Sequence, residues 1–361
     1  MFAATPMINH VKAFPHKKLK AIFHFIFLQQ QCRKIEGGEL IYSEVEVVSV
    51  VGLTCRSLTP HYHFRGRFLQ IQNPFRINGL KIIKMMLDSS EVTPGSTHLV
   101  DELLHSIFFL GKINQVPFTP EEIIGQGMVE RLSQQYPGPF QHYLDQVPKR
   151  SPFSCVMDMV VLQQGQEREE EIRQSLTKLV GNLKPKFLVS STICVSWEQT
   201  SPARYYGVSL STYGPTARNI VTAASCCSVW DDYVAGAVMT YYPANIQNEP
   251  NGAIRLPDNV RCQAFDIRSG SEKNPCLSCG NMFGLYTEET DEFPYGNCAE
   301  TESVSNLLKR EAEVRENTQL QSDAYTAENR QMAREQVRNI LSELLQGLNI
   351  NWDGNFYNPA V

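Results

Sequence analysis

Over the first 84 residues the pattern of apolar and polar positions has no sustained period. A clear period appears in the residues that follow. From Met1 to Lys84, short apolar bursts alternate with scattered histidines and prolines, and neither a period of 2 nor a period of 3.6 persists. We therefore expect residues 1–84 to be poorly ordered or peripheral. Capped and periodic segments begin at Met85.

The spacing of apolar residues predicts helices over residues 85–150. Leucine and isoleucine recur at helical spacing within residues 97–110. A further helix is predicted to start at Thr119, because Pro120 takes the first helical position and Glu122 follows three residues after the cap, the pattern of a capping box. We expect this region to be a helical accessory region.

Residues 151–361 alternate between strand-like and helix-like patterns, which is typical of an α/β fold. Apolar and β-branched runs predict strands over residues 153–163, 186–197, 204–213 and 260–267. Amphipathic or alanine-rich runs predict helices over residues 167–183, 216–242, 299–314 and 326–347. The C-terminal end of the segment 216–242 could instead form a strand.

Composition restricts the classes of protein that the chain can belong to. With 361 residues, 42% hydrophobic and 20% charged, it is not disordered throughout. The net charge of -5 and the absence of long Lys/Arg runs leave no overall positive charge to hold a polyanion. Ten cysteines in this length are too few for a disulfide-stapled secreted domain and indicate a reducing compartment.

The N-terminal region contains a segment that imitates a signal peptide. Basic residues 16–20 precede the apolar run 21–28, but no small-residue cleavage site follows. The run is also shorter than the roughly 20 residues that span a bilayer. We expect no membrane segment and a cytoplasmic or nuclear location.

Cysteines and one glutamate in residues 274–300 carry the candidate chemistry. Cys276 and Cys279 are separated by two residues, so a turn can direct both sulfurs to one metal ion. Cys298 and Glu300 open a predicted helix, where the helix dipole favours anionic groups. Zinc lowers the pKa of bound water from about 15.7 toward about 7, and a neighbouring carboxylate can then transfer the proton.

These residues resemble the metal site of the cytidine deaminase-like superfamily. Cys298-Ala299-Glu300 is similar to its His/Cys-x-Glu motif, and Pro275-Cys276-x-x-Cys279 to its Pro-Cys-x-x-Cys motif. The resemblance implies a three-layer α/β/α fold and one zinc ion, Zn²⁺, held by the three cysteines, with Glu300 as general acid/base. It also implies hydrolytic removal of an amine from a nucleobase, a nucleoside or single-stranded nucleic acid.

Two further residues are candidate substrate contacts. Asn297 directly precedes Cys298 in a stretch that resembles the turn before the glutamate-bearing helix in bacterial toxin-type members. Tyr206 lies at the start of a predicted strand, where its ring could pack in the sheet or stack on a base.

The order of the two motifs departs from the family pattern. In the family the glutamate-bearing motif comes first, and each motif opens one of two adjacent helices. Here Cys279 precedes Cys298, and the 18 residues between them are too few for a full helix and a strand crossover. We therefore expect a loop or short turn to present the Cys-x-x-Cys pair beside the start of the Glu300 helix.

Two other interpretations of the cysteines remain open. Cys262, upstream of Cys276, could complete a closed four-cysteine zinc site that stabilises a non-enzymatic protein-interaction module. Alternatively, the thiols bind no metal. The main hypothesis is a zinc-dependent hydrolytic deaminase built on an α/β domain over residues 151–361, with protein partners that the sequence does not identify.

Overall fold

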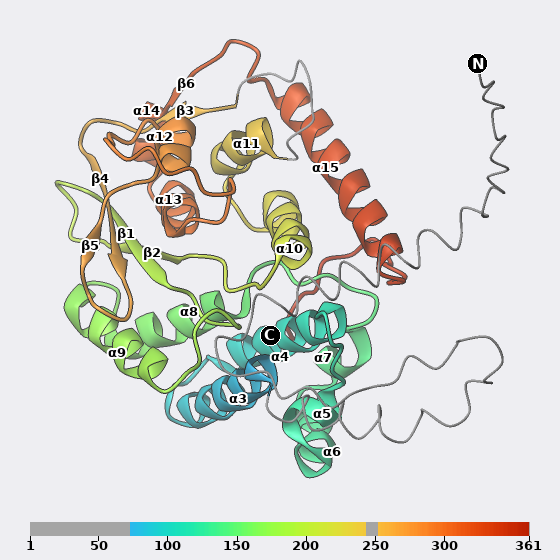
Figure 1. Cartoon of the computed structure of the whole chain (residues 1–361). Helices are drawn as coiled ribbons and strands as arrows, with labels where there is room; N and C mark the ends of the chain where they lie inside the picture. Colours follow the sequence, from blue (N-terminus) through green and yellow to red (C-terminus); the bar gives the residue numbers. More distant parts are fainter. Residues whose placement is uncertain (1–72, 243–251, 361) are drawn as a thin grey trace, which may run out of the picture. The chain divides into compact units, whose positions relative to one another are not determined.

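The computed structural model describes residues 73–242 and 252–360, which belong to one compact unit (Figure 1). Residues 1–72, including the basic and apolar segment at 16–28, lie outside the described residues. None of the helices in the described ranges is long and apolar enough to cross a membrane.

The first described elements are helices that pack around one another. They are α3 (Pro74–Val92), α4 (Thr97–Ile113), α5 (Pro120–Ile124), α6 (Gln126–Gln135) and α7 (Pro137–His142). Helix α3 starts eleven residues before Met85, where we expected order to begin, and continues through Lys84 without a break. The predicted capping box is confirmed, because the Thr119 side chain and the Glu122 side chain each bind the other residue's backbone amide.

Residues 153–163 form a helix, so the predicted strand is wrong. Helix α8 (Pro152–Gln164) begins with a proline at its first turn after Ser151. Almost every residue of its first two turns is buried, so its apolar residues form an unbroken run rather than a stripe. Periodicity cannot distinguish such a helix from a buried strand. Helix α9 (Glu169–Gly181) follows at the predicted position.

Four strands form a small antiparallel sheet with the order β2-β1-β4-β5. Its strands are β1 (Thr192–Glu198), β2 (Tyr205–Val208), β4 (Val260–Asp266) and β5 (Glu272–Lys273). Cys194 lies opposite Gly207 of β2 on one side and Ala264 of β4 on the other. The structure is therefore a mixed α/β fold with a short antiparallel sheet.

Helices cover both faces of this sheet (Figure 1). On one face, Ala299 of α13 (Ala299–Arg310) packs against Cys194 and Ala264. On the other face, the Arg173 guanidinium of α9 lies 3.5 Å from the centre of the Phe265 ring. Successive side chains of a strand point to opposite faces, so the neighbouring residues Ala264 and Phe265 of β4 contact α13 and α9, respectively.

Residues 216–242 form two helices rather than one, and the far end that could have been a strand is helical over residues 232–241. Helix α10 (Pro215–Ser228) ends before Asp231, whose carboxylate caps α11 (Asp232–Tyr241) by accepting from the Tyr233 amide at 2.8 Å. Both helices pack against α15 (Ala327–Gly347), which is the long terminal helix at the right of Figure 1.

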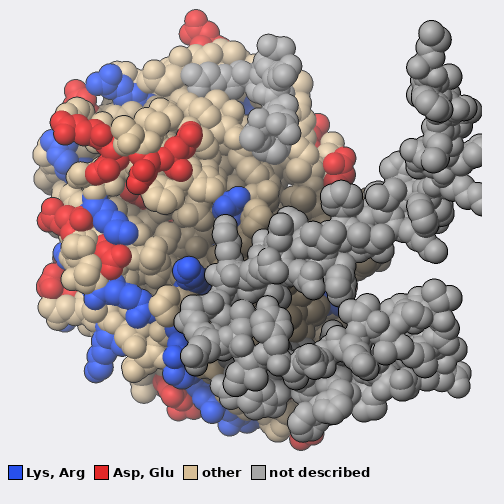
Figure 2. Space-filling view, in the orientation of Figure 1, with Lys and Arg blue, Asp and Glu red and all other residues tan. Residues whose placement is uncertain are grey.

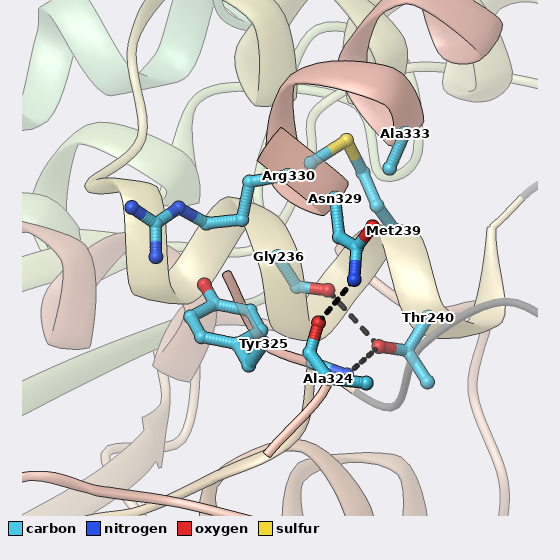
Figure 3. Close-up of a pocket in the computed structure, with 9 residues that line it drawn as sticks. Gly236, Met239, Thr240, Ala324, Tyr325, Asn329, Arg330 and Ala333 are labelled. Atoms are coloured by element: carbon cyan, nitrogen blue, oxygen red, sulfur yellow. Dashed lines mark hydrogen bonds between the residues drawn. The ribbon is translucent and has the colours of Figure 1, made fainter. Parts of the chain in front are cut away.

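The chain between α13 and α15 is fixed against α11. It contains α14 (Ala312–Asn317) and β6 (Gln319–Leu320), which pairs with β3 (Ile254–Arg255). The Tyr325 hydroxyl donates to the Asp232 carbonyl at 2.7 Å, and its ring fills the space beside Gly236 (Figure 3). The cavity left there is about 20 Å³, which is room for one water molecule rather than for a ligand.

Candidate metal centre

Two helices begin side by side and each places cysteine at its N-terminus. Helix α12 (Leu277–Phe283) has Cys276 as its N-cap residue and Cys279 in its first turn, and it ends at Gly284 in the left-handed conformation. Helix α13 has Cys298 as its N-cap residue. The pair is thus presented by a seven-residue helix, where the sequence led us to expect a loop or turn.

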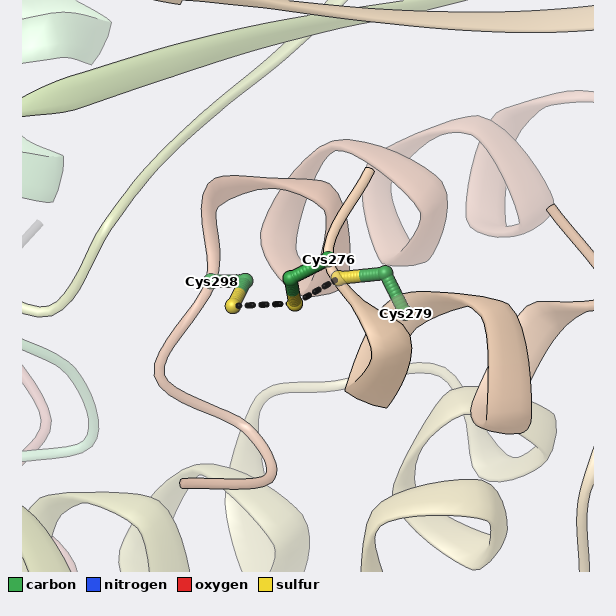
Figure 4. A group of neighbouring side chains, drawn as sticks. All are labelled: Cys276, Cys279 and Cys298. Carbon is green, nitrogen blue, oxygen red and sulfur yellow. Dashed lines mark hydrogen bonds between the residues drawn. The ribbon is translucent and has the colours of Figure 1, made fainter. Parts of the chain in front are cut away.

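The three sulfur atoms converge on one point (Figure 4). The Cys276 sulfur lies 3.6 Å from that of Cys279 and 3.5 Å from that of Cys298, and all three lie within 4.8 Å of one another. Within residues 73–242 and 252–360, these cysteines form the one group of three or more potential metal ligands. The sequence-predicted ligand set is therefore assembled in the structure.

The spacing of the sulfurs fits ligation of one ion. Two thiolates on a tetrahedral zinc, each at about 2.3 Å, lie about 3.8 Å apart, whereas the sulfurs of a disulfide are about 2.05 Å apart. The observed separations of 3.5 and 3.6 Å match the first geometry. Three sulfur ligands leave one position of a tetrahedron open. Such a soft donor set suits zinc, copper(I) or an iron–sulfur cluster.

The Glu300 side chain is buried beside the sulfurs. The residue is 4% exposed and lies in the first turn of α13, directly after Cys298 and Ala299. Burial raises the pKa of Glu300 to about 7, with a further contribution from the charge of Cys276. Glu300 is thus a buried acid in the first turn of the helix that Cys298 caps, and its role as general acid/base stays a prediction.

The thiols are polarised by one another. Contacts with the Cys279 and Cys298 sulfurs lower the pKa of the Cys276 thiol to about 2, while contacts with Cys276 and Cys298 raise the pKa of Cys279. A lowered pKa favours the thiolate, the state in which cysteine binds metals. Cys298 is the partly exposed member of the cluster, whereas Cys276 and Cys279 are buried.

Small residues allow α13 to approach the sheet closely. A Cβ atom built on Gly207 would lie 2.2 Å from the Ser303 amide nitrogen and 2.5 Å from the Ala299 carbonyl oxygen. No side chain fits at that position without displacing the helix backbone. Gly207 was not among the site residues expected from the sequence, although glycine inside a strand often marks such a close approach.

Cys262 is not a member of the cluster. It lies on β4, where its sulfur accepts a hydrogen bond from the Ser196 hydroxyl at 3.2 Å. The Ser196 hydroxyl lies 2.8 Å from that of Ser303 on α13. Burial raises the pKa of the Cys262 thiol to about 12. In this arrangement Cys262 supports the helix that bears Glu300, and within residues 73–242 and 252–360 no fourth cysteine joins the three sulfurs to close a cage.

Of the two expected substrate contacts, only Asn297 lies next to the cluster. It is half-buried immediately before Cys298, and its carbonyl accepts from the Leu210 amide at 3.0 Å. Tyr206 is buried, and its hydroxyl donates to the Gln166 carbonyl at 2.9 Å on the α8–α9 side of the sheet. The structure therefore does not bring the Tyr206 ring to the sulfurs.

An acidic loop borders the cluster. Residues 286–293 carry the exposed carboxylates of Glu288, Glu289, Asp291 and Glu292. The loop is tied to the Cys-x-x-Cys segment, because the Leu277 amide donates to the Asp291 carbonyl at 3.0 Å. Figure 2 shows acidic side chains gathered on the face that carries α12. The negative potential on this side opposes the approach of a polyanion.

Comparison with family models, curated proteins and solved structures finds no match to this chain.

Proposed function

We propose that the three cysteines hold a zinc ion and that the site catalyses hydrolytic deamination of a nucleobase or nucleoside. The observation that carries the proposal is the convergence of the Cys276, Cys279 and Cys298 sulfurs beside the buried Glu300 carboxyl. A site that only stabilises the fold has no need of an acid/base group beside an open position. Helices on both faces of the sheet also support the three-layer arrangement that the resemblance implies.

The reversed order of the two motifs is compatible with this chemistry. Catalysis depends on where the ligand atoms lie and not on the order in which the chain reaches them. Helices α12 and α13 begin side by side, as the two motif-bearing helices of the family do, and the 15 residues from Gly284 to Cys298 make the connection.

The residues around the ion would have separate roles. When bound, zinc supplies Lewis acidity that lowers the pKa of water toward about 7. Glu300 accepts the proton of the attacking water and delivers it to the departing amine, so that ammonia is released and a carbonyl is formed. Asn297, which is half-buried directly before Cys298, would contact the substrate.

A free base or nucleoside suits the site better than single-stranded nucleic acid. The carboxylates of Glu288, Glu289, Asp291 and Glu292 border the Cys-x-x-Cys segment and would repel a phosphate backbone. A neutral base or nucleoside meets no such repulsion.

The proposal is tested by substituting Glu300. Zinc-loaded wild-type protein is incubated with cytosine, adenine and guanine, with their nucleosides and with single-stranded DNA and RNA, and ammonia is measured. Glu300→Gln should retain one zinc per chain and lose turnover by at least about 100-fold, since it keeps the shape of the side chain but cannot transfer a proton. Glu313→Gln, at an exposed position of α14, is the control and should turn over like wild type.

Two outcomes would contradict the proposal. Protein that purifies without metal and binds no added zinc would remove the site itself. Zinc-loaded protein that releases no ammonia from any of these substrates would leave a metal site without this reaction, which favours the non-enzymatic interaction module.

A further inference from the structure

A second site lies at the other end of α13. A cavity of about 750 Å³, called here the edge cavity, opens beside β2, the edge strand of the sheet. Its walls come from α8, from Arg204, Tyr205 and Tyr206, and from Lys309 and Arg310 in the last turn of α13. Its size is within the range of sites for small organic molecules, about 300 to 1,000 Å³.

The residues that line the edge cavity carry more positive than negative charge. Four cationic residues line it, namely Arg150, Arg204, Lys309 and Arg310, and Asp158 is the one carboxylate among its lining residues. Asp158 is already paired with Arg150 at 2.5 Å. Arg150 also binds both carboxylate oxygens of Glu102 at 2.9 Å. These two lining charges are therefore neutralised within the protein.

The other three cations are not matched by lining carboxylates, although the Arg204 guanidinium donates to the Ser201, Pro202 and Ala203 carbonyls and the Lys309 ammonium donates to the Val229 carbonyl. Among the described residues, Lys309 and Arg310 form no ion pair with a carboxylate. Arg204 has Glu169 as its ion-pair partner only at 3.9 Å. Desolvation and the positive charges of Arg150 and Arg310 lower the pKa of Lys309 against the opposing effect of Asp231 and Glu302. An anion in the cavity would relieve this repulsion.

The helix dipole alone does not explain this arrangement. Cations in the last turn of a helix are common, because they interact favourably with its carbonyl end. That effect accounts for Lys309 and Arg310 but not for Arg204, which comes from the chain before β2. Convergence from separate elements around one cavity is typical of a binding site.

The rest of the lining suits an apolar or planar body. Leu99 and Met157 are buried in the wall, and the hydroxyls of Tyr205 and Tyr206 are already bonded to Glu311 and to the Gln166 carbonyl. The Asn306 amide nitrogen donates to the Tyr206 carbonyl at 2.9 Å, which leaves its oxygen to accept from a ligand.

We propose that the edge cavity binds a small phosphorylated molecule with a planar body, of the class of a nucleoside monophosphate, with Arg204, Lys309 and Arg310 around the phosphate. The guanidinium fork matches phosphate oxygens in geometry as well as in charge. Lys309 follows Glu300 by nine positions along α13, which is a rise of about 14 Å. This site is therefore separate from the metal centre.

Calorimetric titration of the full, metal-loaded chain tests the proposal. The probes are AMP, GMP, CMP and UMP, together with adenosine and inorganic phosphate. At least one nucleotide should bind about tenfold more tightly than phosphate or adenosine, because only the nucleotides engage both the cations and the apolar wall. Arg310→Gln should weaken that binding about tenfold, and Glu300→Gln should leave it unchanged.

Lys178→Gln is the matched control for Lys309→Gln, since Lys178 is an exposed lysine in the last turn of α9 and does not line the cavity. The control should bind nucleotide like wild type, and Lys309→Gln should bind about tenfold more weakly. The proposal is overturned if no nucleotide binds at millimolar concentration, if phosphate alone binds as tightly, or if Arg310→Gln binds like wild type.

Discussion

The Glu302 carboxylate accepts a hydrogen bond from the Val208 amide at 2.8 Å, joining the middle of α13 to the edge strand β2. The residue is 7% exposed, and burial raises the pKa of Glu302 from 4.5 to about 7 against the opposing effect of Arg150. The side chain is therefore a buried acid that is protonated over part of the physiological range.

This burial makes stability depend on pH. Because the folded pKa lies above the unfolded value, the contribution of Glu302 is fully present below about pH 4.5 and is lost as the pH rises through about 7. Glu302→Gln keeps an acceptor for Val208 and never ionises. We expect the free energy of unfolding of the variant to exceed that of wild type by about 1 kcal/mol at pH 5 and by about 3 kcal/mol at pH 8.

Urea unfolding at both pH values measures this difference. Glu313→Gln, at an exposed position of α14, is the control and should be within about 0.5 kcal/mol of wild type at both. An equal difference between Glu302→Gln and wild type at pH 5 and pH 8 would show that ionisation of Glu302 is not the cause.

The contact of Gly207 with α13 predicts a steric effect. In Gly207→Ala the new methyl group meets backbone atoms of Ser303 and Ala299, which cannot rotate away. We expect a loss of about 3 kcal/mol in stability and weaker metal binding, because the displaced helix carries Cys298. Differential scanning calorimetry and zinc titration measure the two effects.

Gly127 supplies the matched control for that substitution. It lies in α6 with nothing within 4 Å of an added Cβ atom. Gly127→Ala should be neutral or stabilise the protein by up to about 1 kcal/mol through the better helix propensity of alanine. Equal stability of the two variants would contradict the close approach of α13 to β2.

Prediction from the sequence succeeded where a pattern was local. The capping box at Thr119 and the helix starts at Cys298 and Thr326 each depend on residues within a few positions, and all three appear in the structure. The strand predicted over residues 153–163 failed because α8 is buried nearly all round, and an unbroken apolar run carries no period.

The sequence predicted which residues belong to the ligand set but not how they are arranged in space. Spacing identified Cys276, Cys279 and Cys298 as a possible ligand set, but their convergence depends on how α12 and α13 begin relative to each other. Cys262 matched the spacing of a fourth ligand, and strand pairing directs it to Ser196 instead. Long-range pairing of this kind is not encoded in any short segment.

Metal content separates the open three-cysteine site from the closed four-cysteine cage. Cys279→Ser removes a converging sulfur and should weaken zinc binding by at least about 100-fold. Cys262→Ser keeps a hydrogen-bonding group beside Ser196 and should retain one zinc per chain. Zinc per chain after dialysis is measured by mass spectrometry, and loss of zinc from Cys262→Ser would support the closed cage.

The C-terminal segment is fixed to the helical region through Tyr357. Its ring stacks on His105 of α4 with centroids 3.8 Å apart, and its hydroxyl donates to the buried Asp101 carboxylate. Tyr357→Phe keeps the stack but removes a hydrogen bond from a buried carboxyl group, so we expect a loss of about 1 to 3 kcal/mol in urea unfolding. Tyr286→Phe is the matched control, because Tyr286 is 82% exposed and should change stability by less than about 0.5 kcal/mol. If Tyr357→Phe is as stable as wild type, the hydroxyl contributes nothing to docking of this segment, and the stack with His105 alone must hold it.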